Sequence, residues 1–160
     1  GESIDSVLSI YEGRLSHRHI DLVRKYSHEE EPVYAFEGEL RQVLANVIGN
    51  AIDATGPGGR IIIRACRCRR WSTGERGTRI TVADTGHGIG TELKQRIFEP
   101  FFTTKKATGT GLGLWVTREI IDKHEGYIRV RSSTRAGRSG TVFMMFLPEL
   151  RAKLPATTSV

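Results

Sequence analysis

The 160-residue sequence has no long apolar run, and this absence excludes several classes of protein. No stretch approaches the roughly 20 consecutive apolar residues that a membrane helix needs, and no charged segment followed by an apolar one marks a signal peptide. We therefore expect a soluble, cytoplasmic chain. Its length, with 38% hydrophobic and 26% charged residues, is usual for one domain built around one core.

Cysteine is almost absent as well, with only Cys66 and Cys68 in the chain. Residues i and i+2 of one strand point to the same face, but they lie too far apart for an easy disulfide. No second cysteine pair and no histidine at zinc spacing accompany them, so we expect no metal role for the thiols. A reducing compartment fits this usage.

A net charge of +6 indicates an anionic partner, and Arg64, Arg67, Arg69 and Arg70 crowd one short segment. Most such runs are solvated edges. No nucleic-acid-binding motif or platform of interleaved aromatic residues is present, so we expect no nucleic-acid partner.

Hydrophobic periodicity predicts alternating helices and strands. We expect helices over residues 3–18, 37–55, 91–98 and 112–124, and strands over 19–26, 33–36, 60–71, 78–84, 127–132 and 141–147. The helix after Glu37 has the clearest apolar stripe and ends at a Gly-Pro-Gly-Gly sequence. Residues 99–111 are rich in Gly, Thr and Lys, which is typical of a mobile loop, and the chain after Pro148 has little reason to order.

The helix after Glu37 carries a line of polar residues at steps of three and four: Glu39, Gln42, Asn46, Asn50 and Asp53. Asparagine prefers helix caps, so two of them in mid-helix with apolar neighbours need an explanation. Two amide oxygens on one face can hold a hydrated magnesium ion, because hard cations take oxygen ligands. A solvated helix face is the alternative.

A second polar element, residues 84–90, ends a predicted strand. Ile80 and Val82 alternate inward, which puts Asp84 on the same buried side. A buried carboxylate needs a donor, and the amino group of an adenine is one. Gly86 and Gly88 let the backbone pass close to a flat ligand. A simple strand-ending turn is the alternative reading.

A third element, residues 109–114, is rich in glycine and leads directly into a helix. A helix N-terminus offers unpaired N–H groups to phosphate. The pattern is neither a Walker loop nor a Rossmann fingerprint. Lys105 and Lys106 lie just upstream, where they are either phosphate contacts or solvated side chains.

In this order and spacing, the three elements resemble the N, G1 and G2 boxes of the histidine kinase catalytic domain, in its nitrogen-sensor-like branch. The wider superfamily includes gyrase, Hsp90 and MutL. Residues 97–105 look like the F box, and 140–143 are similar to the closing strand motif. The resemblance covers roughly residues 42–148. It implies an α/β two-layer sandwich of the Bergerat type, a mixed sheet covered on one face by helices, with ATP or ADP under a lid of residues 101–111.

The resemblance also implies roles by position. Asn50 would coordinate Mg²⁺ and Asp84 would read adenine, with Gly86, Gly88 and Ile89 along the base. Thr141 would support Asp84 through water. The phosphate end would be closed by Phe102, Thr103, Lys105, Gly109, Thr110, Gly111, Leu112 and Gly113.

Two positions of this helix depart from parts of the superfamily. Asp53 stands where many members have lysine, which puts phosphate contacts from that turn in doubt. Asn46 stands where the ATPases have a glutamate base. An amide cannot take a proton, so efficient hydrolysis is not expected.

The implied function is transfer of the γ-phosphoryl group of Mg-ATP to a histidine on a separate helical domain, in two-component signalling with a response regulator. His28 precedes Glu29 as an acceptor would, but Pro32 follows too closely for a helix interior. We expect residues 1–18 to be a remnant of the phosphoacceptor region, 19–148 the ATP-binding domain, 149–160 a disordered tail, and the chain a monomer. An ATPase or a non-catalytic nucleotide-binding module is the alternative.

Overall fold

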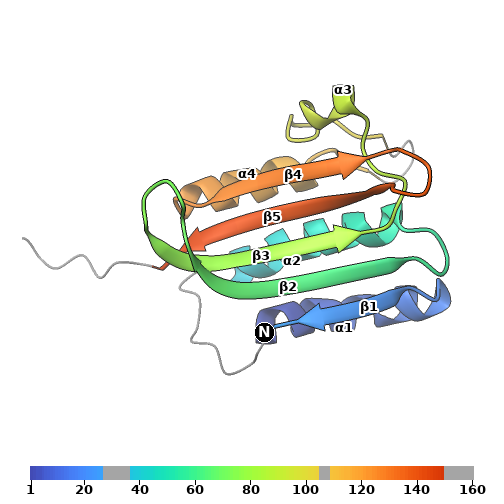
Figure 1. Ribbon diagram of the computed structural model, residues 1–160, viewed down its shortest axis with the longest axis horizontal. Helices are drawn as coiled ribbons and strands as arrows, with labels where there is room; N and C mark the ends of the chain where they lie inside the picture. Colours follow the sequence, from blue (N-terminus) through green and yellow to red (C-terminus); the bar gives the residue numbers. More distant parts are fainter. Residues whose placement is uncertain (27–36, 105–108, 150–160) are drawn as a thin grey trace, which may run out of the picture.

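The computed structural model describes residues 1–26, 37–104 and 109–149, which form two layers (Figure 1). One layer is a five-stranded mixed sheet, and the other consists of α1, α2 and α4 on one of its faces. The elements are α1 (Glu2–His17), β1 (Asp21–Lys25), α2 (Glu37–Ala54), β2 (Arg60–Arg69), β3 (Arg76–Asp84), α3 (Thr91–Lys94), α4 (Gly113–Lys123), β4 (Tyr127–Ser133) and β5 (Gly140–Pro148). The predicted fold class is confirmed.

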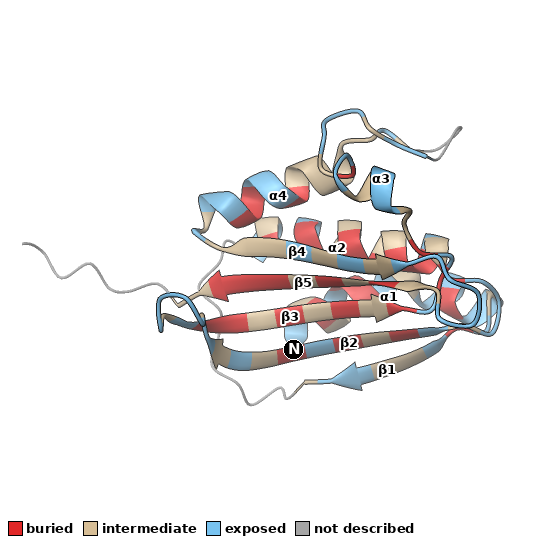
Figure 2. Ribbon diagram, turned by 45° about the horizontal axis from the view of Figure 1, so that its top comes forward, coloured by how far each residue is buried: buried red, intermediate tan, exposed pale blue. Residues whose placement is uncertain are grey.

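The strand order is β1-β2-β3-β5-β4, with β1 parallel to β2 and every other pair antiparallel. β2 and β3 therefore form one antiparallel pair, and β4 and β5 form another. The edge strands β1 and β4 contain no fully buried residue, whereas β2, β3 and β5 do (Figure 2). The core thus lies between the three inner strands and the helices.

The predicted apolar stripe of α2 supplies the centre of this core. Its buried residues are Leu40, Val43, Leu44, Val47, Ile48, Ala51 and Ile52. They recur at steps of three and four, so they occupy one broad side of the helix. α2 contacts both α1 and α4, and its polar line bonds to each of them, through Asp53 to α1 and through Asn46 to α4.

The first helix belongs to the same core. Ile4, Val7, Leu8 and Leu15 of α1 are buried there, and the Tyr11 hydroxyl donates a 3.1 Å hydrogen bond to the carbonyl oxygen of Ala45 in α2. Residues 1–18 and the rest of the described chain are therefore not two packing units. That α1 derives from a phosphoacceptor region stays a prediction.

Two elements are shorter than the sequence predicts. The helix predicted over 91–98 ends at Lys94, and residues 95–98 continue as turns. The first strand begins at Asp21, after His19 with φ of 51°. Outside the described residues lie the predicted strand 33–36, His28, Lys105 and residues 150–160 of the tail predicted over 149–160. The first residue of that tail, Glu149, donates its backbone N–H to the carbonyl oxygen of Arg76 (3.0 Å).

Within the described residues, no helix combines the length and apolarity needed to cross a membrane. Both cysteines are free thiols, as their spacing predicts, and both are half-buried.

Candidate functional site

Asp84 is the buried carboxylate at the end of β3, with 8% of its surface exposed. Its Oδ1 accepts hydrogen bonds from the backbone N–H groups of Gly86 (2.8 Å) and Thr141 (3.2 Å). Burial raises the pKa of this carboxyl above its ordinary value, and the two backbone donors only partly offset that effect. Since both bonds end on Oδ1, Oδ2 is left to accept from a ligand.

The loop after Asp84 is fixed against the protein's own backbone. A Cβ at position 86 would lie 2.4 Å from the carbonyl oxygen of Ala54, the last residue of α2, and one at position 88 would lie 2.0 Å from that of Ser133. Gly88 also has φ of 76°. Close approach does require these glycines, but the approach that the structure shows is to α2 and β4.

Ser132 of β4 holds the loop after Asp84. No sequence pattern predicted this residue as part of the site. Its Oγ accepts from the N–H of Ile89 (2.7 Å), donates to the carbonyl oxygen of Gly140 (2.8 Å) and lies 2.9 Å from Thr141 Oγ1. Thr141 therefore supports Asp84 directly through its backbone N–H, while its hydroxyl faces Ser132. A lone serine in a strand gives no sequence signal, since its partners follow from the β4–β5 register.

On the polar line of α2, Asn46 bridges to α4. Its Nδ2 donates to the carbonyl oxygen of Gly113 (2.9 Å) and to Thr117 Oγ1 (3.3 Å). These bonds explain an asparagine in mid-helix, because the amide is satisfied by a neighbouring helix rather than by its own turn. Asn50 lies one turn further on and is half-buried.

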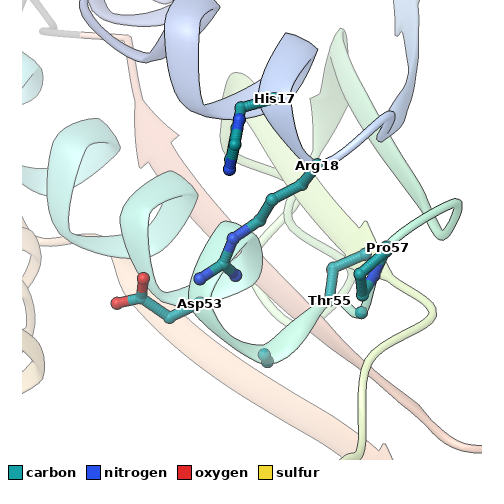
Figure 3. Close-up of a pocket in the computed structure, with 7 residues that line it drawn as sticks. His17, Arg18, Asp53, Thr55 and Pro57 are labelled. Carbon is teal, nitrogen blue, oxygen red and sulfur yellow. The ribbon is translucent and has the colours of Figure 1, made fainter.

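Asp53 lies in a different hollow from Asp84. It forms an ion pair with Arg14 of α1 and lines a hollow of about 490 Å³ with His17, Arg18, Thr55 and other residues at the C-terminal ends of α1 and α2 (Figure 3). Asp84 lines a second hollow, of about 370 Å³, with residues of β4 and β5. The structure thus does not bring Asp53 together with Asp84.

The glycine-rich segment 109–113 leads into the first turn of α4. The N-cap residue, Leu112, makes no side-chain capping hydrogen bond, so the first N–H groups of α4 can bind an anion. The Leu112 N–H itself lies 3.4 Å from Thr110 Oγ1. Gly111 has φ of 69°, and a Cβ there would lie 2.3 Å from the carbonyl carbon of Phe101.

The two described ends of the predicted lid therefore touch at Phe101 and Gly111. Phe101 is 76% exposed, whereas Phe102 is half-buried with the Arg96 guanidinium 4.5 Å from its ring centroid. Thr103 is exposed. Figure 1 shows α3, the end of β3 and the start of α4 at the same end of the sheet, so the predicted adenine and phosphate elements face one region.

Comparison with known proteins agrees with this arrangement. Residues 36–151 match the family described as "Histidine kinase-, DNA gyrase B-, and HSP90-like ATPase". The signal transduction histidine-protein kinase AtoS of Escherichia coli is 37% identical over 81% of this chain. The chain spans only 20% of the length of AtoS.

Solved structures give the same result over the whole fold. The catalytic domain of histidine kinase ThkA superposes with a TM-score of 0.76 at 35% identity, covering 92% of this chain and 91% of that domain. ThkA in complex with the response regulator protein TrrA superposes with a TM-score of 0.74 at 33% identity, covering 96% of this chain and 41% of that one.

Proposed function

Because the chain belongs to the family of histidine kinase-, DNA gyrase B- and HSP90-like ATPases, as a histidine kinase ATP-binding catalytic domain, we propose that Asp84 reads the adenine of Mg-ATP and that the γ-phosphoryl group goes to a histidine on a separate helical domain. A response regulator would be the next recipient, since the related ThkA was solved with one.

The Asp84 carboxylate is the observation that carries this proposal. An ionised carboxylate only accepts hydrogen bonds, and an adenine edge offers an N–H donor beside an apolar ring. With Oδ1 held by two backbone N–H groups, Oδ2 is oriented before any ligand arrives. Such preorganisation reduces the entropy lost on binding.

At the phosphate end, the uncapped first turn of α4 and the glycines at 109, 111 and 113 suit an anion. Among the described residues, no three His, Cys, Asp or Glu side chains are grouped to hold a metal ion. This fits Mg²⁺, which is commonly bound by one or two protein oxygens together with substrate phosphates and water. Asn50 would supply the amide oxygen, and the ion would neutralise charge on the phosphate oxygens.

Transfer would make one bond and break one. A nitrogen of the acceptor imidazole bonds to the γ-phosphorus, the bond from phosphorus to the bridging oxygen breaks, and ADP leaves with that electron pair. The imidazole proton passes to a base beside the acceptor. This chain binds and orients the nucleotide. Asn46 occupies the position of the ATPase glutamate but cannot act as a base. The amide N–H groups of Asn46 are bonded to α4.

Two of the four described histidines each have one ring nitrogen engaged within the fold. His87 Nδ1 lies 2.7 Å from the carbonyl oxygen of Gly88, and His124 Nε2 lies 2.9 Å from Glu39. We infer that the acceptor histidine stands on another domain. Within the same proposal, residues 1–18 would be a remnant of that domain, and a response regulator would be the partner.

Calorimetry with ADP, ATP and magnesium tests the adenine assignment. Asp84→Asn replaces one of the two carboxylate oxygens, an acceptor, by an amide NH2 group, a donor. Losing a charge-assisted bond of about 1.5–3 kcal/mol weakens binding roughly 10- to 150-fold. Asp122→Asn is the matched control, since it removes the same charge from an exposed ion pair on α4. Equal affinities for the Asp84 variant and the unchanged chain would reject the assignment.

A further inference from the structure

Cationic side chains have different partners on the two sides of the molecule. Five on the helix side are ion-paired: Arg14 with Asp53, Arg24 with Asp5, Arg41 with Glu37, Arg118 with Asp122 and Lys123 with Glu39. On the open face of the sheet, Lys25, Arg64, Arg129 and Arg131 form no ion pair within the described residues. Two open-face arginines outside these four are paired: Arg60 with Asp21, and Arg70 with Glu75.

Strand register arranges the open face of the sheet, the face toward the viewer in Figure 1, in cross-strand rows. The first row is Val23, Ile62, Ala83, Val142 and Arg131, and the second is Lys25, Arg64, Thr81, Met144 and Arg129. We call these ten residues the open-face rows. Their centre is mostly apolar and half-buried, whereas the four unpaired cations stand mainly toward the edge strands.

The next row is already covered. Phe146 is 0% exposed although it points to the open face, because it lies over Gly77, stacks on Tyr127 at 5.3 Å and is capped by the Arg70 guanidinium at 5.0 Å. This closes the apolar surface near the β2–β3 hairpin. The open-face rows, in contrast, keep half-buried apolar side chains, among them Val23, Ile62, Val142 and Met144.

Protection of an open sheet against aggregation is the simplest explanation for exposed arginines. Protection against aggregation explains why the open face is charged, but it does not require that all the charges be positive. Surfaces that serve only solubility mix positive and negative charges. The helix side of this chain does mix them, through its ion pairs. The single sign of the open-face rows is the part that solubility leaves unexplained.

We propose that the open-face rows are a docking surface for an acidic protein partner. Carboxylates at the rim of that partner would pair with Lys25, Arg64, Arg129 and Arg131, and its apolar centre would cover Ile62, Val142 and Met144. An apolar centre with a charged rim is the usual anatomy of a protein interface. A single-stranded nucleic acid would use stacking aromatics, and the Tyr127 and Phe146 rings here are already stacked or capped.

The test uses a defined probe, a 20-residue helical peptide with leucines on one side bordered by glutamates, titrated into the full 160-residue chain. We expect it to bind more tightly than a polyglutamate peptide of equal charge. Chemical-shift changes should map to β2, β5 and β4, with ADP affinity unchanged. Combined Arg64→Glu and Arg129→Glu should weaken binding by about tenfold or more, and the remaining affinity should fall with salt.

Two further variants separate the components. Met144→Gln keeps the length and charge of the side chain but removes an apolar contact, and should weaken peptide binding several-fold. Arg41→Glu reverses a charge on the helix side and should leave it unchanged. The proposal is overturned if polyglutamate binds equally well, if Arg41→Glu weakens binding as much as a single open-face reversal, or if a 24-base-pair DNA duplex or phosphatidylglycerol vesicles bind these rows more tightly than the peptide. Retained ADP affinity separates any such failure from failure of the proposed function.

Discussion

The side-chain amide of Asn46 donates a 2.9 Å hydrogen bond to the carbonyl oxygen of Gly113, which joins the middle of α2 to the first residue of α4. A carboxylate at position 46 would face that carbonyl with no proton to donate. We expect Asn46→Asp to lower the free energy of unfolding by about 1–3 kcal/mol. Urea unfolding measures this free energy. The control is Gln42→Glu, which makes the same amide-to-carboxylate change at an exposed site one turn earlier.

Ser132 is expected to act as a positioning residue for nucleotide binding. Ser132→Ala leaves the Ile89 N–H without its acceptor and releases the loop after Asp84, at a cost of about 1–2 kcal/mol, or roughly 5- to 30-fold in ADP affinity. Ser133→Ala removes only an exposed contact to the Arg135 N–H and should bind normally. Equal affinities of the two variants, measured by calorimetry, would show that the Ser132 bonds do not hold the loop.

Local patterns in the sequence predicted much of this site. They did not predict the hydrogen bonds between residues that are far apart in the chain. Alternation of Ile80 and Val82 placed Asp84 correctly on the buried side, and the apolar stripe identified α2 with its polar line. The bonds from Asn46 to Gly113 and from Ser132 to Ile89 join residues 67 and 43 positions apart. They depend on how helices and strands pack, which periodicity does not encode.

Glycine at position 88 is expected to be indispensable. With φ of 76° and the Ser133 carbonyl oxygen 2.0 Å from an added Cβ, Gly88→Ala forces the loop or β4 to move. We expect a loss of about 1–3 kcal/mol in the free energy of unfolding. Gly90→Ala is the matched control, because a Cβ there meets nothing within 4 Å. If the two variants melt at the same temperature in thermal unfolding, the packing argument for Gly88 is wrong.

Acidity should act on binding and on stability with opposite signs. Burial raises the pKa of Asp84 above 3.8, and an adenine donor favours the ionised form, so nucleotide affinity should fall as pH drops through that raised pKa. Without nucleotide, a raised folded-state pKa gives a contribution to stability that is present below the unfolded pKa and lost as pH rises through the folded one. Calorimetry and unfolding across this acidic range should show both slopes, and Asp84→Asn should flatten both.

The central claim is that this chain transfers phosphate to a histidine on another domain. Its most direct measurement is acid-labile label from γ-labelled ATP, with the chain alone and with a dimer of its phosphoacceptor helices. We expect no stable label on the chain alone and slow labelling of the helices in trans, because no tether raises their effective concentration. Asn50→Ala should abolish that labelling while the fold is retained. Label on the chain's own histidines, or none on the supplied helices, would contradict the account.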